Sequence, residues 1–339
     1  MKRLSWSSLP IFLGMLALLV TGCAKGETST PTLSERPSRV KVSLALDWYP
    51  NANHAGLYMA GERGYFEDEN LEVDIFTPGD PATVLQTVAS GRDDFGISYQ
   101  TEVLLARQED VPVVSVMAIV QHPLNVLMTL KSSGIDRPGK LKGKSVGYPG
   151  IAYDVPLLET MLEADGLILA DVELVNVGFN LVQALVGKRV DAVIGAYVSH
   201  ETILAENQGY PVNVIRMEDW GVPDFYELVL VTSEKKLKED PDVVRRFLRA
   251  VVRGYDAAME DPQAAIDLLL SVYAEADEAV ERPGVGVLVP LWRSDQGAFG
   301  WQEEARWTDF ANWMKANGLL REDIDPLKAF SNEYMPDIL

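Results

Sequence analysis

The stretch Leu46-Asp47-Trp48-Tyr49-Pro50-Asn51-Ala52-Asn53-His54-Ala55-Gly56-Leu57-Tyr58 marks the place where a strand ends and a helix begins. Before it, residues 40–46 alternate apolar side chains with polar or small ones, which is the period-two pattern of a strand. Pro50 must end that strand because it has no donor N–H, and Asn51 and Asn53 can cap a following helix. In open α/β sheets, ligands bind beyond the carboxyl ends of strands. The residues that we expect to meet a ligand there are Asp47, Trp48, Tyr49 and Asn51.

Strand and helix patterns alternate along the rest of the chain. In the first block we predict strands at 71–77, 95–99 and 111–120, with helices at 81–90 and 101–108. A second block starts at Ser145, with strands at 145–148, 172–177 and 192–197 and helices at 155–164 and 181–186. This alternation predicts an α/β fold in which mainly parallel sheets are flanked by helices.

A quasi-repeat predicts that the two blocks are lobes of one architecture. Residues 85–97 place Gln, Gly, a basic residue, Asp and then apolar residues in the same order as residues 182–194. We place a crossing near 127–130 and a return strand at 225–232, followed by helices at 243–259, 263–273 and 302–317. The expected boundaries are residues 40–130 plus 230–339 for lobe 1 and residues 131–229 for lobe 2.

The amino terminus predicts export and lipidation. Lys2 and Arg3 precede a short apolar run at 11–20, and Val20-Thr21-Gly22-Cys23 has the small residues and the cysteine of a lipoprotein cleavage site. The run is shorter than the roughly 20 residues that span a bilayer. We therefore expect residues 1–22 to be a signal peptide, Cys23 to be lipidated, and residues 23–39 to be a tether on the extracytoplasmic face of the cell membrane.

Composition limits the classes of partner and of chemistry. The chain of 339 residues has a net charge of −20, and loss of residues 1–22 removes two basic residues and no acids, giving −22. So acidic a protein is unsuited to nucleic acid and disfavours an anionic ligand. The three histidines have no metal-ligand spacing, and Cys23 is the single cysteine. We expect no metal, no resident cofactor and no catalytic residue, although His54 and His200 are predicted near the ligand cleft.

Aromatic residues near the predicted strand ends indicate a flat ligand. Tyrosine and tryptophan rings can stack on a planar molecule while their polar groups bond its rim. Each ring taken alone is more often ordinary packing, so the shared location carries the prediction. The aromatic set is Trp48, Tyr49, Tyr99, Tyr148, Tyr153, Tyr197, Trp220, Phe225 and Tyr226. Three acids beside these rings, Glu102, Glu201 and Glu227, either pair with an amidine-like edge of a ligand or belong to a solvated face.

Six motifs in order resemble the NMT1/THI5-like family, over about residues 41 to 270. They are Leu46 to Asn51, Gly96 to Gln100, Gly147 to Gly150, Gly178 to Leu185, Gly195 to Tyr197 with His200-Glu201, and Gly221 to Leu228. The resemblance implies a type II periplasmic-binding fold whose two lobes close over a ligand and deliver it to an ABC permease and its ATPase. The ligand-binding positions that it implies are Asp47, Trp48, Tyr49, Asn51, Tyr99, Tyr148, Tyr197, Glu201, Tyr226 and Glu227.

The resemblance leaves the ligand open between riboflavin and a thiamine pyrimidine, such as formylaminopyrimidine or hydroxymethylpyrimidine. One rival hypothesis is a membrane-tethered enzyme of pyrimidine synthesis, as in the eukaryotic branch of the family. That branch uses a histidine and a cysteine-rich run, whereas this chain has Glu102 at the histidine position and no cysteine in 221–226. A second rival keeps the fold but binds an anion such as an alkanesulfonate or nitrate.

Overall fold

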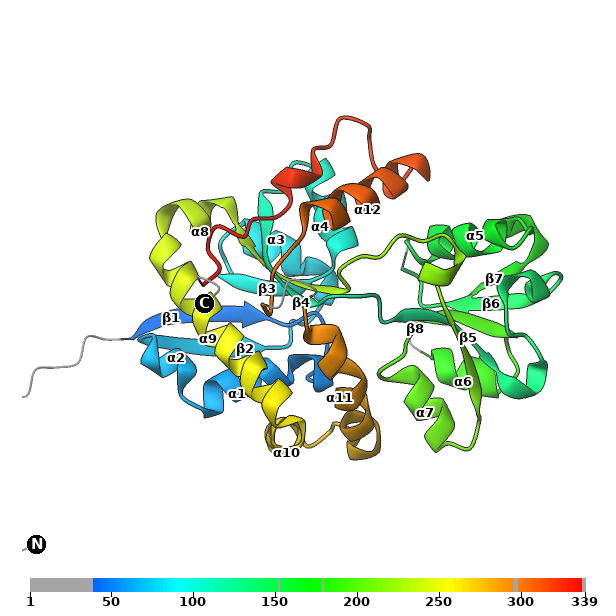
Figure 1. The fold of residues 1–339 in the computed structure, drawn as a ribbon, viewed down its shortest axis with the longest axis horizontal. Helices are drawn as coiled ribbons and strands as arrows, with labels where there is room; N and C mark the ends of the chain where they lie inside the picture. The colour runs from blue at the N-terminus through cyan, green and yellow to red at the C-terminus, as the bar shows by residue number, and fades with distance from the viewer. Residues whose placement is uncertain (1–38, 152, 179, 295–297, 337–339) are drawn as a thin grey trace, which may run out of the picture. The chain divides into compact units, whose positions relative to one another are not determined.

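The computed structural model describes residues 39–151, 153–178, 180–294 and 298–336 (Figure 1). The predicted signal peptide, Cys23 and nearly all of the tether lie outside these residues. Within the described ranges, no helix combines the length and the apolar character needed to cross a membrane.

Two five-stranded sheets share one strand order. The first runs β2 (Leu71–Phe76), β1 (Val40–Ala45), β3 (Phe95–Ser98), β10 (Leu228–Ser233) and β4 (Val113–Val120). The second runs β7 (Glu173–Asn176), β6 (Ser145–Tyr148), β8 (Ala192–Tyr197), β5 (Asn125–Leu130) and β9 (Val212–Arg216). In each sheet one strand, β10 or β5, runs antiparallel to both neighbours, and the other observed pairs are parallel. The predicted α/β fold with two mainly parallel sheets is confirmed.

The chain passes between the sheets twice, at residues 121–124 and 217–227. The predicted boundaries assign β5 to the first lobe, but it belongs to the second sheet because its backbone bonds to β8 and β9. β10 returns to the first sheet and begins three residues after the strand that we predicted from residue 225. Each antiparallel strand therefore comes from the segment directly after a crossing.

Helices cover both faces of the first sheet, as Figure 1 shows. On one face lie α1 (Ala55–Glu62), α2 (Tyr65–Asp68), α9 (Pro241–Glu260) and α10 (Pro262–Val272). On the other lie α3 (Val84–Ala89), α4 (Gln100–Gln108) and α12 (Glu304–Ala316), while α8 (Glu234–Glu239) follows β10. The second sheet carries α5 (Asp154–Ala164), α6 (Leu181–Val186) and α7 (Glu201–Asn207).

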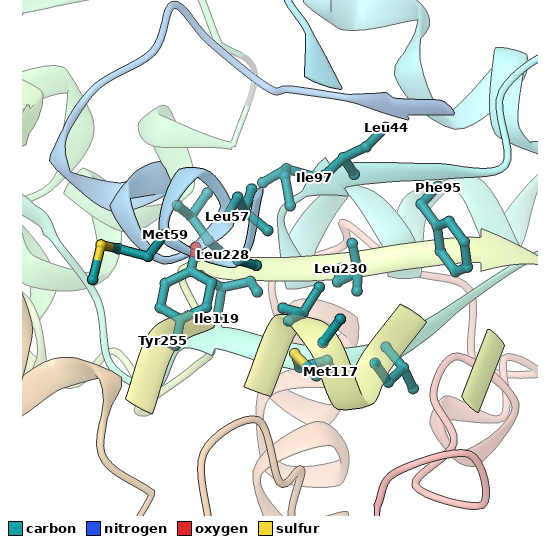
Figure 2. Close-up of a cluster of buried hydrophobic side chains, with 14 of the residues drawn as sticks. Leu44, Leu57, Met59, Phe95, Ile97, Met117, Ile119, Leu228, Leu230 and Tyr255 are labelled. Atoms are coloured by element: carbon teal, nitrogen blue, oxygen red, sulfur yellow. The ribbon is translucent and has the colours of Figure 1, made fainter. Parts of the chain in front are cut away.

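The core between the first sheet and α9 is closely packed. Leu228 and Leu230 point from β10 to the α1 and α9 side, together with Leu44 and Ile97 (Figure 2). Phe95 stacks on Phe247 of α9 with ring centroids 4.1 Å apart. Since these side chains are apolar and buried, they supply the main favourable term for holding α9 on the sheet.

Helix α11 (Glu278–Trp292) was not predicted, because its sequence contains Pro283 and Pro290, which normally end helices. The Asp277 side chain caps it by accepting from Ala279 N, and apolar side chains on one face are buried. Pro283 has no N–H to donate to the carbonyl four residues earlier. That carbonyl, of Ala279, instead accepts a 2.8 Å hydrogen bond from Asn207 Nδ2 of α7.

Candidate ligand-binding site

A cavity of about 440 Å³ is lined by segments from both sheets. Its wall includes residues that follow the carboxyl ends of β1, β3, β6 and β8, which is the edge where the sequence predicted a ligand. Residues 273–288, at the end of α10 and in α11, complete the wall. The volume lies in the usual range for small-molecule sites.

Seven of the ten predicted site residues line this cavity. They are Asp47, Trp48, Tyr49, Asn51, Tyr99, Tyr197 and Glu201. The structure does not place Tyr148, Tyr226 or Glu227 in the wall. The structure thus brings most of the predicted set together, and the ligand contacts of each residue stay a prediction.

Asp47 is held by two neighbours rather than left open. Tyr99 Oη donates to Asp47 Oδ2 at 2.8 Å, and His54 Nε2 lies 2.9 Å from Oδ1. Asn51 N donates to His54 Nδ1 at 3.3 Å, which leaves Nε2 as the protonated nitrogen that donates to Asp47. His54 is 1% exposed and lies behind the wall. It therefore orients the 47–54 loop through Asp47 and Asn51 and is not among the residues that line the cavity.

The three predicted residues outside the wall have other partners. Glu227 accepts hydrogen bonds from Leu124 N at 2.7 Å, Asn125 N at 3.1 Å and Tyr197 Oη at 2.8 Å. Burial raises the pKa of this carboxyl group. Tyr226 is fully buried, and its hydroxyl accepts from the backbone N–H of Glu303 at 2.7 Å. Tyr148 packs against the core that includes α5.

The cavity also contains residues that sequence reasoning did not select. Asn125, Asp154, Tyr273 and Glu281 line it, and so does Tyr153, which was among the aromatics noted at strand ends. Glu281 accepts from Ala52 N at 2.6 Å, so α11 buttresses the turn before α1. Asp154 offered one signal that was overlooked, since it opens a helix just after a predicted strand and its Pro-Gly turn.

The wall is acidic. Its carboxylates belong to Asp47, Asp154, Glu201, Glu275, Asp277 and Glu281, and the described lining residues include no lysine or arginine. Among the described lining residues, His200 is the one that can become a cation. Burial lowers the pKa of His200, but its 3.0 Å bond to Glu201 and the charges of Glu281 and Asp277 outweigh that effect and raise it overall. The site therefore favours neutral or cationic ligands.

Asp154 predicts a measurable pH dependence of stability. Burial is the main cause that raises its pKa from 3.8 to about 7, with a further contribution from Glu227. Since the folded state holds this proton more tightly than the unfolded state, stability from Asp154 is present at low pH and is lost as pH rises toward 7. From about pH 5 to about pH 8, the wild type should lose on the order of 3 kcal/mol relative to Asp154→Asn, which cannot titrate. Urea unfolding of both proteins at the two pH values measures this; a constant difference would contradict it.

A family profile matches most of the chain that the structure describes. The profile described as NMT1/THI5 like matches residues 51–265, which is more than half of the sequence. This chain belongs to the NMT1/THI5-like family. The match to this family confirms the resemblance that the six motifs indicated, and it includes most of the cavity wall.

Relatives within the NMT1/THI5-like family include binding proteins and enzymes. A formylaminopyrimidine-binding protein of Halalkalibacterium halodurans is 38% identical over 322 residues, covering 94% of this chain and 98% of that one. The riboflavin-binding protein RibY of Chloroflexus aurantiacus is 30% identical over 340 residues, covering 95% and 96%. A 4-amino-5-hydroxymethyl-2-methylpyrimidine phosphate synthase of Aspergillus parasiticus is 26% identical over 310 residues, covering 87% of each chain.

Solved structures show that this NMT1/THI5-like chain has the fold of periplasmic binding proteins. The aliphatic sulphonate binding protein SsuA of Escherichia coli superposes with a TM-score of 0.68 at 13% sequence identity, covering 90% of this chain and 95% of that one. At this identity the likeness concerns the fold.

Among the described residues, no group of three or more His, Cys, Asp or Glu side chains is arranged to hold a metal ion.

Proposed function

We propose that the protein is the solute-binding component of an ABC importer and captures a planar heteroaromatic vitamin or vitamin precursor for its permease. The observation that carries this proposal is the 440 Å³ cavity, which combines aromatic rings with acidic groups. The rings of Tyr49 and Tyr273 lie nearly parallel, 12° apart in plane and 6.5 Å between centroids. Trp48 stands edge-on to Tyr49. Such rings suit a flat ligand.

Riboflavin and a thiamine pyrimidine are the two candidate ligands. Two relatives that align with nearly the whole chain are named for formylaminopyrimidine binding and for riboflavin binding, and both names support a flat heteroaromatic ligand. The deciding experiment is to purify the protein from a rich extract, denature it and identify the released small molecule by mass spectrometry. A yellow, flavin-fluorescent preparation would point to riboflavin. Release of no heteroaromatic compound, with no binding of either candidate in calorimetry, would overturn the proposal.

The acidic wall argues against the anion alternative. Cationic side chains are the strongest donors to a sulfonate or nitrate, and the described part of the wall has six acidic side chains, no lysine or arginine, and one histidine, His200, which is bonded to Glu201. Calorimetry with an alkanesulfonate should therefore show no binding. Tight binding of that anion, with no response to riboflavin or pyrimidines, would replace the present proposal.

The enzyme alternative rests on relatives that are named as synthases. This chain has one cysteine, Cys23, which is distant in sequence from residues 221–226, and it has Glu102 in the place expected for the family's histidine.

A second kind of enzyme, a serine hydrolase, is indicated by Gly-x-Ser-x-Gly spacing, which residues 143–147 have. In such hydrolases the serine follows the end of a strand, but Ser145 begins β6, and its hydroxyl lies 3.2 Å from Asp191. We propose a non-enzymatic protein. Incubation with pyridoxal phosphate and iron, followed by product analysis, would revive the enzyme if a pyrimidine appeared.

We also propose that Cys23 carries the lipid anchor that holds the protein on the extracytoplasmic face of the cell membrane. The support is the sequence pattern before Cys23 together with the binding-protein fold. The lobes remain as proposed apart from β5, which pairs with the second sheet. Fractionation of cells that express Cys23→Ser tests the anchor, because this variant should leave the membrane fraction.

Trp48→Ala should weaken ligand binding by about 1 to 3 kcal/mol, because it removes a stacking ring from the cavity wall. Calorimetry with the ligand identified above measures the change. The matched control is Trp220→Ala, since Trp220 lies outside the cavity wall with its ring 5.4 Å from the Arg137 guanidinium. Equal affinity of the wild type and Trp48→Ala would remove Trp48 from the set of ligand contacts.

A further inference from the structure

One carboxyl oxygen of the cavity wall has no hydrogen-bond partner among the described residues. Asp154 is 1% exposed, and its Oδ1 accepts a 3.0 Å hydrogen bond from Asn125 Nδ2. Its other oxygen, Oδ2, is buried and accepts nothing from the described chain. A buried carboxyl oxygen without a donor costs free energy of folding. The fold retains it on the wall of the site where a ligand could supply the donor.

The neighbours of Asp154 fix which oxygen is available. Asn125 Oδ1 accepts from Gly195 N at 2.9 Å, so the Asn125 amide must present its NH₂ group to Asp154. Gly195 has φ +93°, and a Cβ added there would lie 3.3 Å from Asp154 Oδ2. The ring of Pro149 would lie closer still to that Cβ, at 2.8 and 2.9 Å, so the absence of a side chain at Gly195 makes room for Pro149 as well as for Oδ2. Asn125, Asp154 and Gly195 all line the cavity.

The charged and titratable groups around Asp154 supply no cation. Glu227, in the segment before β10, and Tyr153, beside it in the chain, are the groups that interact electrostatically with it. The charge of Glu227 disfavours a negative charge on Asp154, and Asp154 in turn raises the pKa of the Tyr153 hydroxyl. Because burial raises the pKa of Asp154 to about 7, a donor from a ligand, and best a cationic one, would favour the deprotonated carboxylate, whose Oδ2 can accept.

We infer that Asp154 Oδ2 accepts a hydrogen bond from an amino group or a protonated ring nitrogen of the ligand, and thereby selects amino-substituted pyrimidines over flavins. The inference rests on the proposed function and narrows its ligand class. An aminopyrimidine offers N–H donors at its edge. The ring N–H of a flavin lies between two carbonyl oxygens, which would face the carboxyl group with like partial charge. A site built to bond a ligand N–H rejects analogues without one.

Titration calorimetry on Asp154→Asn tests the inference. In this variant the amide oxygen of the new asparagine still accepts the hydrogen bond from Asn125. The NH₂ group of the new asparagine then faces the ligand, in the place of the acceptor oxygen Oδ2. Affinity for 4-amino-5-hydroxymethyl-2-methylpyrimidine should fall by about 100-fold. The matched control is Glu218→Gln, since Glu218 also has a buried, unpartnered oxygen but lies outside the cavity wall. This control should bind within about twofold of the wild type.

A second measurement does not depend on the folding of any variant. The wild type should prefer the 4-amino pyrimidine by about 100-fold to the analogue with hydrogen in place of the 4-amino group, which has no N–H to donate. Equal affinity for these two compounds, or a folded Asp154→Asn protein that binds as the wild type does, would overturn the inference and leave the proposed function in place. Binding of riboflavin in preference to the pyrimidine would do the same. Failure to bind either class would overturn both.

Discussion

Replacing Glu227 with alanine should lower the free energy of unfolding by about 3 kcal/mol or more. The carboxylate accepts from two backbone N–H groups, of Leu124 and Asn125, and from the Tyr197 hydroxyl. Alanine would leave all three donors without their acceptor in a fully buried place. The first two donors lie at one crossing between the sheets, and Glu227 lies at the other. Loss of these hydrogen bonds should therefore loosen both crossings. Urea unfolding followed by circular dichroism measures it.

The control for this prediction is Glu227→Gln. Its side-chain oxygen can still accept from the two backbone N–H groups, and burial already raises the pKa of Glu227, which shows that the buried site disfavours the charge. The expected cost is about 1 kcal/mol. If alanine and glutamine destabilised the protein equally, the charge of Glu227 would matter more than its role as acceptor.

Gly254→Ala should destabilise the protein by about 3 kcal/mol or prevent its accumulation. A Cβ at this position of α9 would overlap the Gly56 carbonyl oxygen of α1 and lie 2.7 Å from Ala60 Cβ. The Gly56 oxygen is backbone and cannot rotate away, so the helices would have to separate. Tyr255 Oη donates to Asn53 O at 2.8 Å, so the displacement would also reach the cavity wall. Thermal unfolding and ligand titration of the variant measure both effects.

Gly61→Ala is the matched control on the same pair of helices. A Cβ at Gly61 meets nothing within 4 Å, and the residue is helical. This substitution should raise stability by about 0.5 to 1 kcal/mol, because alanine loses less backbone entropy than glycine in a helix. A Gly254→Ala protein that unfolded at the wild-type temperature would show that α1 and α9 can part without cost.

Much of the fold could be predicted because its local patterns agree with its tertiary structure. The strand at 192–197 has the predicted bounds, since its apolar residues are continuous and Gly187 ends the helix before it. The strand order could not be predicted, because β5 and β10 reach their positions through contacts distant in sequence. Helix α11 was missed because burial of Trp292 and Leu288 and the Asp277 cap outweigh two prolines, and neither burial nor capping is visible in the sequence.

The candidate site was predicted in part for a related reason. Residues 47–51 follow directly from the end of β1, so their position required only a strand boundary. Glu227 and Tyr226 precede a strand, and the sequence does not tell which of its residues face the cavity and which face the core. Asp154 depends on burial and on a hydrogen bond to Asn125, 29 residues earlier. Asp154 could therefore be recognised as a site residue only from the folded structure.

Pro283 leaves one backbone carbonyl of α11 without a partner inside the helix, and α7 bonds to this carbonyl. In an ordinary helix, a side chain that binds an interior carbonyl competes with the helix's own N–H. The Ala279 carbonyl has no such rival, because the proline four residues later cannot donate. Asn207 can therefore release this oxygen and bind it again while the backbone bonds of α11 stay as they are. Loss of the Asn207 bond would therefore remove no backbone hydrogen bond from α11, the helix that forms part of the cavity wall.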